Sequence, residues 1–300
     1  MSSYTPPPAL DRPVRYVGLA KRPKGLRLPP DRMPIMMDWR LLKRWRYVAV
    51  WTSDITVYGA SAWTGPVAQE FWAVWDRRNK KFYERTRNLI PGKVRLSPRG
   101  RMYVQDRTKA GDRVEFDVAL EEDEGFEVVS PQGRAYTWTR KELIPARGTA
   151  RINGEERRVE GPAFIDDNAG YHARRTRWKW CGGVGTDERG RAVGWNLIVG
   201  LNDTPGASEN TLWIDRTAHE VGPVTFAPDL SSVTFAEGGT LHFHQETTRK
   251  QLDNFIVLRS DYEQPLGTFT GTFPDVTSTP PRQVALVESY GVMERQDALW

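Results

Sequence analysis

The sequence has a single cysteine, Cys181, and only four histidines in 300 residues. One cysteine cannot form an intramolecular disulfide, which is typical of a protein from a reducing compartment. Its neighbours Trp180 and Gly182 favour a buried, inert thiol over a nucleophile. No apolar run reaches the roughly 20 residues of a membrane-spanning helix, and the N-terminal segment lacks the apolar stretch of a secretory signal. We therefore expect a cytoplasmic protein without a membrane span.

An excess of charge of either sign is also small. The 43 basic residues face 38 acidic ones, which gives a formal net charge of +5. The densest basic cluster comprises Arg174, Arg175, Arg177 and Lys179, and no long basic run occurs. A modest excess spread in this way is typical of solvated surface charge and argues against a nucleic-acid partner.

Sequence signatures of the common cofactor and hydrolase sites are absent. The run Gly182-Gly183-Val184-Gly185 has no helical pattern beside it, so it does not have the context of a dinucleotide-binding loop. The chain also lacks a Walker sequence, a G-x-S-x-G elbow and an HExxH motif. These absences predict no cofactor.

Short strands and turns make up most of the chain. From Trp45 to Thr52 the period is two, with Trp45, Tyr47, Ala49 and Trp51 on one face. Similar runs follow at short spacing, and Asn153-Gly154 is the strongest hairpin signal among their turns. One short helix is expected at residues 38–46, and none longer than two turns is predicted. Many short strands of this kind predict an all-β sandwich or barrel.

The predicted domain organisation has three parts. Prolines concentrate in residues 1–34, which predicts an extended arm without regular strand pairing. The size and strand count fit two antiparallel β-barrels at residues 35–185 and 186–300, joined near Gly182–Gly190. The 12 tryptophans predict broad apolar surfaces, in a large core, a ligand cavity or both.

The stretch from Asp166 to Trp180 concentrates acidic, basic and indole side chains. Gly170 should end one strand, and alternation in the next places one set of residues on a single face pointing into a barrel: His172, Arg174, Thr176, Trp178 and Trp180. Buried there, Arg174 would need Asp166 or Asp167 as its carboxylate partner. Two interpretations remain open. The residues form a catalytic cavity with Asp166, Asp167, His172 and Arg174, or an Arg–Asp tether closes a barrel end.

A second pattern is His242-Phe243-His244-Gln245-Glu246. Two histidines on one strand face, joined by Glu246, form a pattern from which zinc sites can be built. Leu241 and Phe243 on the opposite face are the better core candidates, so we expect the histidine face to be exposed to solvent. No metal is expected.

A third candidate pairs Asn196 with Asn210 and Trp213. Asn196 lies within a predicted strand, two residues after Gly194, and an amide beside a glycine on an inner face leaves room for a ligand. The alternative is that Asn196 and Asn210 bind the backbone of nearby loops.

Four stretches carry a resemblance to a known family. They are Lys43-Arg44-Trp45 with its following strand, Gly170-Tyr171 through Trp180, Glu209-Asn210-x-Leu212-Trp213, and Gly291 through Glu294 to Trp300. They resemble the domain-of-unknown-function 2804 family over nearly the whole chain after the arm. In overall layout the chain is also similar to the tandem lipocalin-like proteins of the carotenoid 1,2-hydratase (hydroxyneurosporene synthase) and AttH-like group.

The resemblance implies two lipocalin-like barrels with an apolar pocket at or near their junction. Relatives act on isoprenoid or polyketide substrates by protonating or orienting alkenes, which makes Asp166 or Asp167 the acid here. The relatives usually place a tryptophan near the Asp pair, where this chain has Asn168, Ala169 and Tyr171. The residues expected to contact a ligand are Tyr171, Thr176, Trp178, Trp180, Asn196, Asn210 and Trp213.

Two functions follow from this pattern. The first is the binding of a hydrophobic small molecule, such as an isoprenoid, lipid or polyketide, in a Trp-lined cavity. The second is a lyase- or isomerase-type activity, hydratase or cyclase, on such a ligand with Asp166 or Asp167 as general acid. The sequence leaves open whether the chain is an enzyme and what its oligomeric state is.

Overall fold

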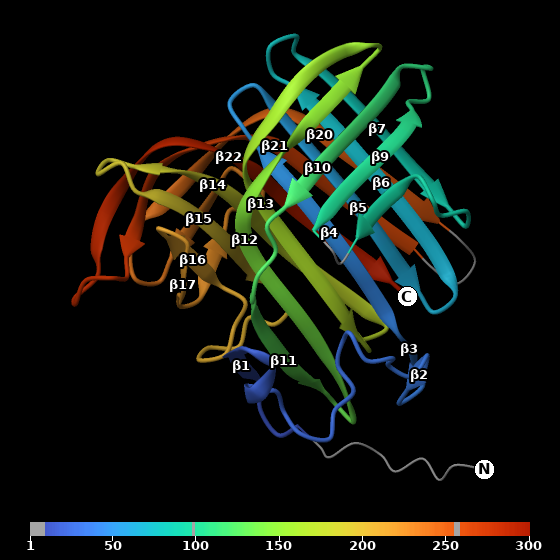
Figure 1. The fold of residues 1–300 in the computed structure, drawn as a ribbon. Helices are drawn as coiled ribbons and strands as arrows, with labels where there is room; N and C mark the ends of the chain where they lie inside the picture. Colours follow the sequence, from blue (N-terminus) through green and yellow to red (C-terminus); the bar gives the residue numbers. More distant parts are fainter. Residues whose placement is uncertain (1–9, 98–99, 255–258) are drawn as a thin grey trace.

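The computed structural model describes residues 10–97, 100–254 and 259–300. This part of the chain forms antiparallel strands almost throughout, and its one helical element is the 3-10 helix η1 (Leu19–Lys21). No helix in it is long and apolar enough to cross a membrane. Figure 1 shows two curled sheets, one blue to green and the other yellow to red, packed against each other. The predicted all-β fold class is confirmed.

The first sheet contains the N-terminal half of the chain. Its path is β7-β6-β5-β4-β13-β12-β10-β9-β8, and β11 pairs with both β12 and β1. A Cβ added at Gly59 on β5 would lie 3.0 Å from Val94 Cγ1 on β8, so the sheet curls back on itself. Its strands are β1 (Val14–Val17), β4 (Lys43–Trp51), β5 (Ile55–Thr64), β6 (Val67–Asp76), β7 (Lys81–Asn88), β8 (Val94–Ser97), β9 (Arg101–Arg107), β10 (Arg113–Leu120), β11 (Phe126–Gln132), β12 (Ala135–Ile152) and β13 (Glu155–Gly170).

The second sheet contains the C-terminal half. Its path is β17-β16-β15-β14-β22-β21-β20-β19-β18. Its strands are β14 (Arg175–Asp187), β15 (Ala192–Val199), β16 (Thr211–Ile214), β17 (Thr217–Glu220), β18 (Val224–Phe226), β19 (Ser232–Phe235), β20 (Thr240–Asn254), β21 (Arg259–Asp275) and β22 (Arg282–Leu299). A separate ribbon, β2 (Met36–Met37) with β3 (Arg40–Leu41), precedes β4.

The Asn153-Gly154 turn joins the two long strands β12 and β13. Both residues have positive φ, 50° and 93°, as a two-residue hairpin turn requires, and asparagine and glycine tolerate that conformation best. The predicted hairpin is confirmed. Its register runs from Ile152↔Glu155 along the whole pair and places Lys141 directly opposite Asp166. This turn therefore sets a pair of charged residues that the site uses.

The apolar side chains of the described residues form four cores, one within each sheet, one between the sheets and one beneath the arm. On β4, Val48 and Val50 point into the curl of the first sheet, whereas Tyr47 and Trp51 face the second sheet. Phe164 on β13 also faces the second sheet, and its ring centroid lies 5.6 Å from that of Trp180 and 6.0 Å from that of Trp213. These aromatic contacts join the two sheets, and the candidate site continues directly from them.

The chain passes from the first sheet to the second between Gly170 and Arg175. Strand β14 therefore pairs within the second sheet, although the predicted division after residue 185 assigned most of it to the first barrel. Gly182 and Gly183 lie within this strand. A Cβ added at Gly182 would be 2.5 Å from the Trp180 ring, and one added at Gly183 would be 2.3 Å from the Trp195 ring. These glycines make room for indoles rather than forming a linker. The division into two folding domains stays a prediction.

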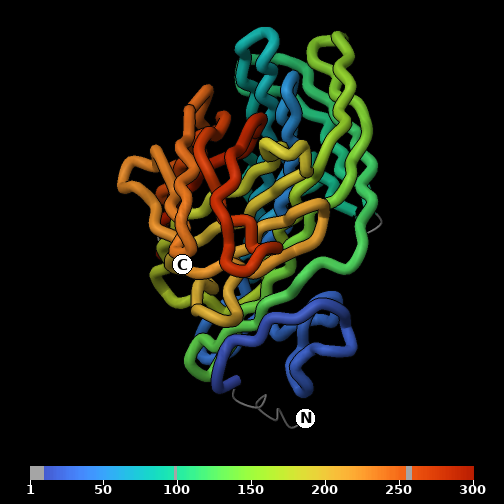
Figure 2. Tube along the Cα trace, turned by 90° about the vertical axis from the view of Figure 1, so that its left-hand side faces the viewer, coloured from blue at the N-terminus to red at the C-terminus, as the bar shows by residue number. Residues whose placement is uncertain are grey.

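The structure corrects two predictions near the N-terminus. The helix expected at 38–46 is absent: Asp38 and Trp39, with φ of 48° and 60°, form the turn between β2 and β3, and β4 begins at Lys43. The alternating pattern of β4 outweighs the local helical spacing of the leucines. The arm is also not free of pairing, because β1 pairs with β11. In Figure 2 the blue arm covers the lower end of the molecule.

Candidate functional site

A cavity of about 980 Å³ lies where the two sheets face each other. Residues of β4, β5, β6, β12 and β13 line it from the first sheet, and residues of β14, β15, β20, β21 and β22 line it from the second. Its indole side chains are those of Trp39, Trp45, Trp63, Trp178, Trp180 and Trp300. A volume of this size accommodates a drug-sized or isoprenoid-sized molecule.

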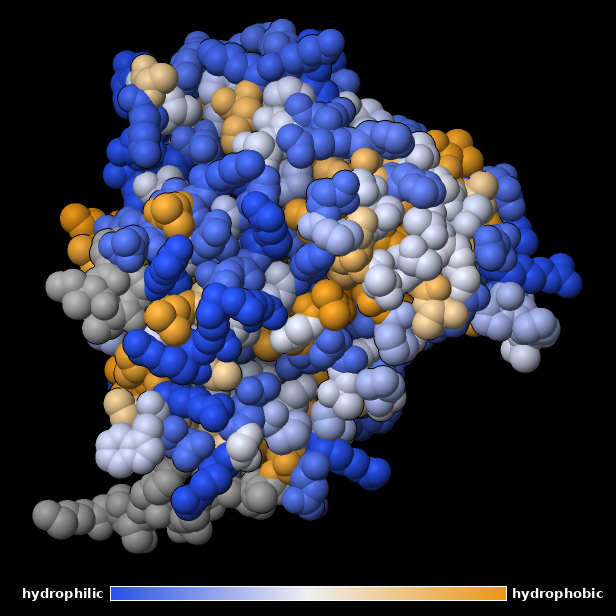
Figure 3. Space-filling model, turned by 180° about the vertical axis from the view of Figure 1, so that it is seen from behind, coloured by the Kyte–Doolittle hydropathy of each residue, from blue (hydrophilic) through white to orange (hydrophobic). Residues whose placement is uncertain are grey.

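The mouth of this cavity carries exposed apolar side chains. Trp39 on the β2–β3 turn is 94% exposed and Leu89 after β7 is 68% exposed, and both line the cavity together with Leu41 and Val67. Figure 3 shows hydrophobic side chains at the surface on the left-hand edge of that view, where the β2–β3 end of the chain lies. Apolar groups around an opening suit the entry of an apolar ligand.

The first group of charged residues in the wall is Lys141, Asp166 and Glu209. Lys141 Nζ lies 2.5 Å from Asp166 Oδ1 and 2.9 Å from Glu209 Oε2. Burial lowers the pKa of Lys141, but the two carboxylates outweigh it and the pKa lies above its usual value. Burial raises the pKa of Glu209. Two carboxyl groups thus share one buried ammonium, and Asp166 is the more exposed of the two, at 14% against 1%.

A third carboxyl group, Glu294 on β22, lies in the wall formed by the second sheet. Its Oε1 accepts a hydrogen bond from Trp178 Nε1 at 2.8 Å, and its Oε2 accepts from Tyr262 and Gln264, both at 2.9 Å. Burial raises the pKa of Glu294 despite these donors, and the charge of Asp166 raises it further. Asp166 of the first sheet and Glu294 of the second therefore lie in one cavity and affect each other electrostatically.

The hydroxyl of Tyr47 is one of the buried polar groups of the cavity that the described residues leave without a hydrogen-bond partner, and Nδ2 of Asn168 is another. Burial raises the pKa of Tyr47 well above its usual value, and Tyr58, Glu294 and Asp166 add to that effect. A buried hydroxyl normally has a partner, so a ligand in the cavity would find a neutral hydrogen-bond donor at Tyr47.

His172 lies in the same wall beside Trp45. Its ring is stacked on that of Trp45 with 5.4 Å between centroids, and Trp45 is in turn stacked on Trp178 at 6.1 Å. The His172 Nε2–H group donates to Asn168 Oδ1 at 2.9 Å. Burial, reinforced by the charges of Lys43 and Arg40, lowers the pKa of His172 to about 3. His172 is therefore a neutral imidazole that extends the aromatic wall.

The depressed pKa of His172 predicts a pH-dependent loss of stability. Below its ordinary pKa of 6.5 the unfolded chain takes up a proton here that the folded chain does not take up until about pH 3. The free energy of unfolding should therefore fall by about 1.4 kcal/mol per pH unit from this residue as the pH drops below 6.5, and not above it. Urea unfolding between about pH 7 and about pH 5 measures the free energy of unfolding as a function of pH, for the native chain and for His172→Gln as the reference. The two curves should converge as the pH falls, and parallel curves would contradict the prediction.

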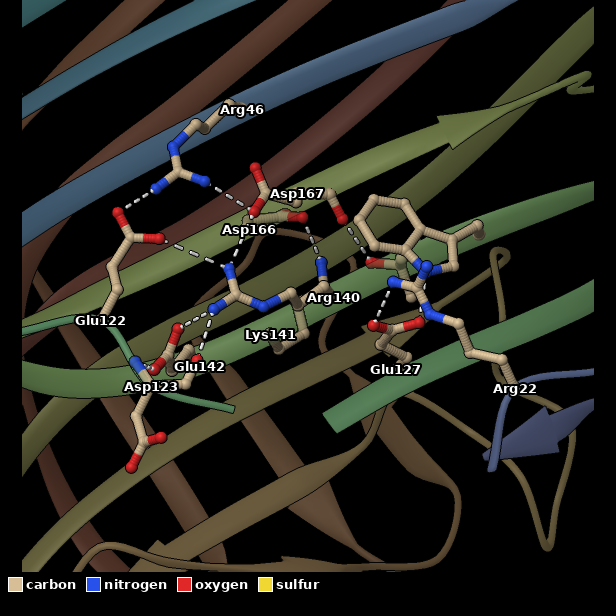
Figure 4. A network of polar contacts seen from close by, with 12 residues as sticks. Arg22, Arg46, Glu122, Asp123, Glu127, Arg140, Lys141, Glu142, Asp166 and Asp167 are labelled. Atoms are coloured by element: carbon tan, nitrogen blue, oxygen red, sulfur yellow. Dashed lines mark hydrogen bonds and ion pairs between the residues drawn. The ribbon is translucent and has the colours of Figure 1, made fainter. Parts of the chain in front are cut away.

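Asp166 and Asp167 lie on opposite faces of β13. Asp167 points away from the cavity, where it accepts hydrogen bonds from Arg46 at 2.8 Å and Arg140 at 3.2 Å. Figure 4 shows this network, which continues from the two arginines to Glu122 and Glu142, while Asp166 and Lys141 point the other way. Of the two aspartates that the sequence proposed as acids, the cavity therefore receives only Asp166.

The predicted burial of Arg174 with a carboxylate partner is wrong. Arg174 is exposed at the cavity mouth and donates to the main-chain oxygen of Trp300, because β14 begins only at Arg175 and the strand alternation does not extend to it. Within β14 the predicted alternation holds for Thr176, Trp178 and Trp180. Their face is directed at the first sheet, however, and it is Cys181 that lies in the core of the second sheet.

The remaining predicted ligand contacts lie outside the cavity. Tyr171 belongs to the core beneath the arm, where its hydroxyl donates to Pro34 O. Thr176 accepts a bond from Trp300 Nε1 and bonds Ala173 O. Asn196 accepts from Trp180 Nε1 and donates to Glu209 O. Asn210 accepts from Ile198 N, and Trp213 packs on Phe164. These residues pack against or bond to residues of the cavity wall without lining the cavity themselves. Asn196 and Asn210 bind backbone groups, which is the alternative proposed for them from the sequence.

The His242–Glu246 segment forms no common site. A bulge between Gln245 and Thr247 interrupts the pairing of β20 with β21 and changes the alternation at Glu246. Glu246 accepts hydrogen bonds from Trp75 and Arg77 of the first sheet, whereas His244 bonds Thr270. Both histidines are exposed. Among the described residues no group of His, Cys, Asp and Glu side chains could hold a metal ion.

Residue-by-residue reasoning did not select several members of this site, namely Lys43, Trp45, Tyr47, Lys141, Glu209 and Glu294. A signal was nevertheless present. Each of the four stretches that carry the family resemblance contributes to the cavity. They supply Lys43 and Trp45 from the first, His172, Arg174, Trp178 and Trp180 from the second, Glu209 from the third, and Glu294, Gln296 and Trp300 from the fourth. Segments far apart in the sequence share this one location.

The solved structures found to be similar to this chain are distant from it in sequence. Kievitone hydratase from Nectria haematococca has a TM-score of 0.50 and 10% identity, with 84% of this chain and 88% of that chain covered. An AttH-type protein from Nitrosomonas europaea has a TM-score of 0.47 and 14% identity, with 90% and 98% covered. CghA has a TM-score of 0.40 and 11% identity, with 85% and 87% covered.

Comparison with the sequences of curated proteins gave no significant match. The profile of one protein family, described as a domain of unknown function (DUF2804), matches residues 98–300. The matched part contains both β12–β13 and the complete second sheet, and thus Lys141, Asp166, Glu209 and Glu294 of the cavity. The family resemblance inferred from the sequence is confirmed, and the chain belongs to the DUF2804 family.

Proposed function

We propose that the chain is a lyase- or isomerase-type enzyme, a hydratase or cyclase, that acts on a hydrophobic small molecule in the cavity between the sheets. The observation that carries the proposal is the meeting of buried acidic groups with indole walls in one cavity. The shared fold of kievitone hydratase adds support, because its name describes addition of water to an organic molecule. A fold alone does not determine a reaction, so the argument rests on the chemistry of the cavity.

Asp166 is the residue we propose to exchange the proton. The buried group Lys141–Asp166–Glu209 holds two carboxyl groups and one ammonium, so it has one negative charge in excess when both carboxyls are ionised. Taking up one proton neutralises the group, and low dielectric surroundings favour that state. Both carboxyl groups line the cavity, and Asp166 is the more exposed of the two. The proton would therefore leave and return through Asp166.

The aromatic wall would stabilise the positive charge that protonation of an alkene creates. Trp45 and Trp178 present stacked rings, and Trp180 lies next to them on β14. In a hydration, Asp166 adds its proton to one alkene carbon and water attacks the other. Glu294 takes the proton that the water loses, so atoms and charge balance. In a cyclisation the same wall would orient the alkenes and no water would be added.

Isotope incorporation tests this proposal even while the substrate is unidentified. The protein is incubated in D2O with an extract of hydrophobic metabolites, and products that gain carbon-bound deuterium are sought by mass spectrometry. We expect at least one labelled product. Ala62→Phe, which fills the cavity from β5, should abolish it, and Ala119→Phe on the exposed side of β10 should not. A label that survives Ala62→Phe would reject the cavity as the site.

Binding without chemistry is the second candidate, and the same cavity favours it. A carrier would retain a hydrophobic molecule through purification and return it unchanged. Mass spectrometry of molecules that co-purify with the protein identifies such a ligand. Retention of a ligand by both the native chain and Asp166→Asn, with no deuterium entering it in either, would establish the carrier function and reject the enzyme.

A further inference from the structure

We propose that the ligand of this cavity carries an anionic head group, a carboxylate or a phosphate, which binds to Lys43 and Arg40 at the mouth while its apolar body lies against the tryptophans. This inference rests on the proposed function and specifies its substrate class. It follows from the positions of the cations in the cavity and from the partners that they have.

Lys43 is the central residue. It is the first residue of β4, and it is only 3% exposed although it carries a charge. The ammonium donates to the main-chain oxygen of His172 at 3.1 Å and lies 5.6 Å from the centroid of the Trp300 ring, and no other hydrogen bond joins it to the described residues. Within the described residues it forms no ion pair. A buried ammonium without a carboxylate is unfavourable unless another anion arrives, and Lys43 faces the ligand cavity.

Other cations surround Lys43. Burial lowers the pKa of Lys43 to about 8, and the nearby charges of Arg40 and Arg174 contribute. Arg174 donates to the main-chain oxygen of Trp300, and Arg40 donates to those of Gln132 and Tyr171. Asp38 also lines the mouth, but no ion pair within the described residues joins it to either Arg40 or Lys43. The main-chain carbonyl oxygens of Gln132 and Tyr171 therefore satisfy Arg40 geometrically and leave its positive charge uncompensated.

The cations elsewhere in the cavity differ in this respect. Lys141 is paired with two carboxylates. Arg249 is 3.3 Å from Glu84 and lies over the rings of Phe71 and Tyr262. Among the described residues of the cavity, positive charge without an internal partner is thus confined to the Lys43 end. A ligand with one anionic end and an apolar body would match this arrangement, with its head at Lys43 and its body directed towards Asp166.

A matched pair of fluorescent probes tests the inference. The probes are 1-pyrenebutyric acid, which is anionic, and 1-pyrenebutanol, which is neutral and of similar shape. Titration with tryptophan fluorescence quenching gives both dissociation constants. A charge-assisted bond to a buried ammonium should make the acid bind roughly 10-fold to 100-fold more tightly than the alcohol. The phosphate ester of 1-pyrenebutanol identifies which anion the mouth prefers.

Variants assign that preference to Lys43. Lys43→Met should remove most of it, and Lys43→Arg, which keeps the charge, should retain it. Lys179→Met is the matched control, because Lys179 also donates to a main-chain oxygen at 3.1 Å, that of Ala227, but lies outside the cavity. If Lys43→Met does not fold, Arg40→Gln takes its place and should weaken the preference.

The outcomes separate this inference from the proposed function. Equal binding of acid and alcohol by the native chain, or a preference that survives both Lys43→Met and Arg40→Gln, would overturn the anionic head group and leave the hydrophobic cavity intact. Failure of both probes to bind would reject the cavity as a hydrophobic ligand site.

Discussion

Replacing Asp166 by asparagine is expected to reduce turnover by about 100-fold to 10,000-fold, the usual contribution of a positioned general acid. The amide keeps the size of the side chain and its place opposite Lys141 but cannot donate or accept the transferred proton. Ligand binding should change little, because the indole walls remain. Deuterium incorporation under single-turnover conditions measures the effect, and dissociation constants for 1-pyrenebutanol show whether the cavity stays intact.

Asp167→Asn provides an unusually close control for this prediction. Asp167 is the next residue in the chain, is also buried in an ionic network and undergoes the same chemical change, but its side chain lies on the other face of β13. Activity per folded molecule should remain within a few-fold of the native value. If both variants lost activity equally, or if Asp167→Asn lost more, the assignment of the acid would be wrong.

The second large effect concerns stability, in Lys141→Met. This change leaves Asp166 and Glu209 together in the wall without the cation that both contact. Removing one partner of a buried ion pair destabilises proteins by about 3–5 kcal/mol, because the remaining charge is uncompensated. Chemical denaturation of the native chain and of the variant measures the difference. The structure gives a reason for the upper part of that range, since two carboxyl groups lose their partner at once.

A neutral replacement of the whole group distinguishes this cause from lost packing. In Lys141→Met combined with Asp166→Asn and Glu209→Gln no buried charge of the group remains, and most of the lost stability should return. Lys250→Met serves as the surface control. Lys250 is 64% exposed and paired with Glu263, so its loss should change stability by no more than about 0.5 kcal/mol. A triple variant as unstable as Lys141→Met would indicate that shape rather than charge determines the effect.

Local patterns predicted much of the fold and part of the site. Alternation assigned Thr176, Trp178 and Trp180 to one face of β14, and the Asn153-Gly154 turn predicted the hairpin that sets Lys141 opposite Asp166. Both are short-range consequences of strand geometry and turn conformation. Alternation requires neighbouring aspartates on a strand to point in opposite directions, but it does not indicate which one faces the ligand.

Long-range pairing was beyond such patterns. Nothing local to Lys141 or Glu209 indicates that a loop before β16 meets β12, since that contact depends on how the two sheets pack. Arg174 was misplaced because β14 begins one residue after it, and a bulge moved Glu246 away from the histidines. Strand starts and bulges shift alternation by one residue, which is enough to reverse a side chain.

The most direct test of the central claim is the crystal structure of Asp166→Asn bound to the hydrophobic molecule that it retains or, failing that, to 1-pyrenebutanol. The proposed function predicts that the ligand lies between the two sheets, in contact with Trp45 and Trp178 and within hydrogen-bonding distance of the Tyr47 hydroxyl. A second groove, lined by Arg46 and Asp167, lies outside this cavity. A ligand bound in that groove, or enclosed within the curl of a single sheet, would contradict the proposed function.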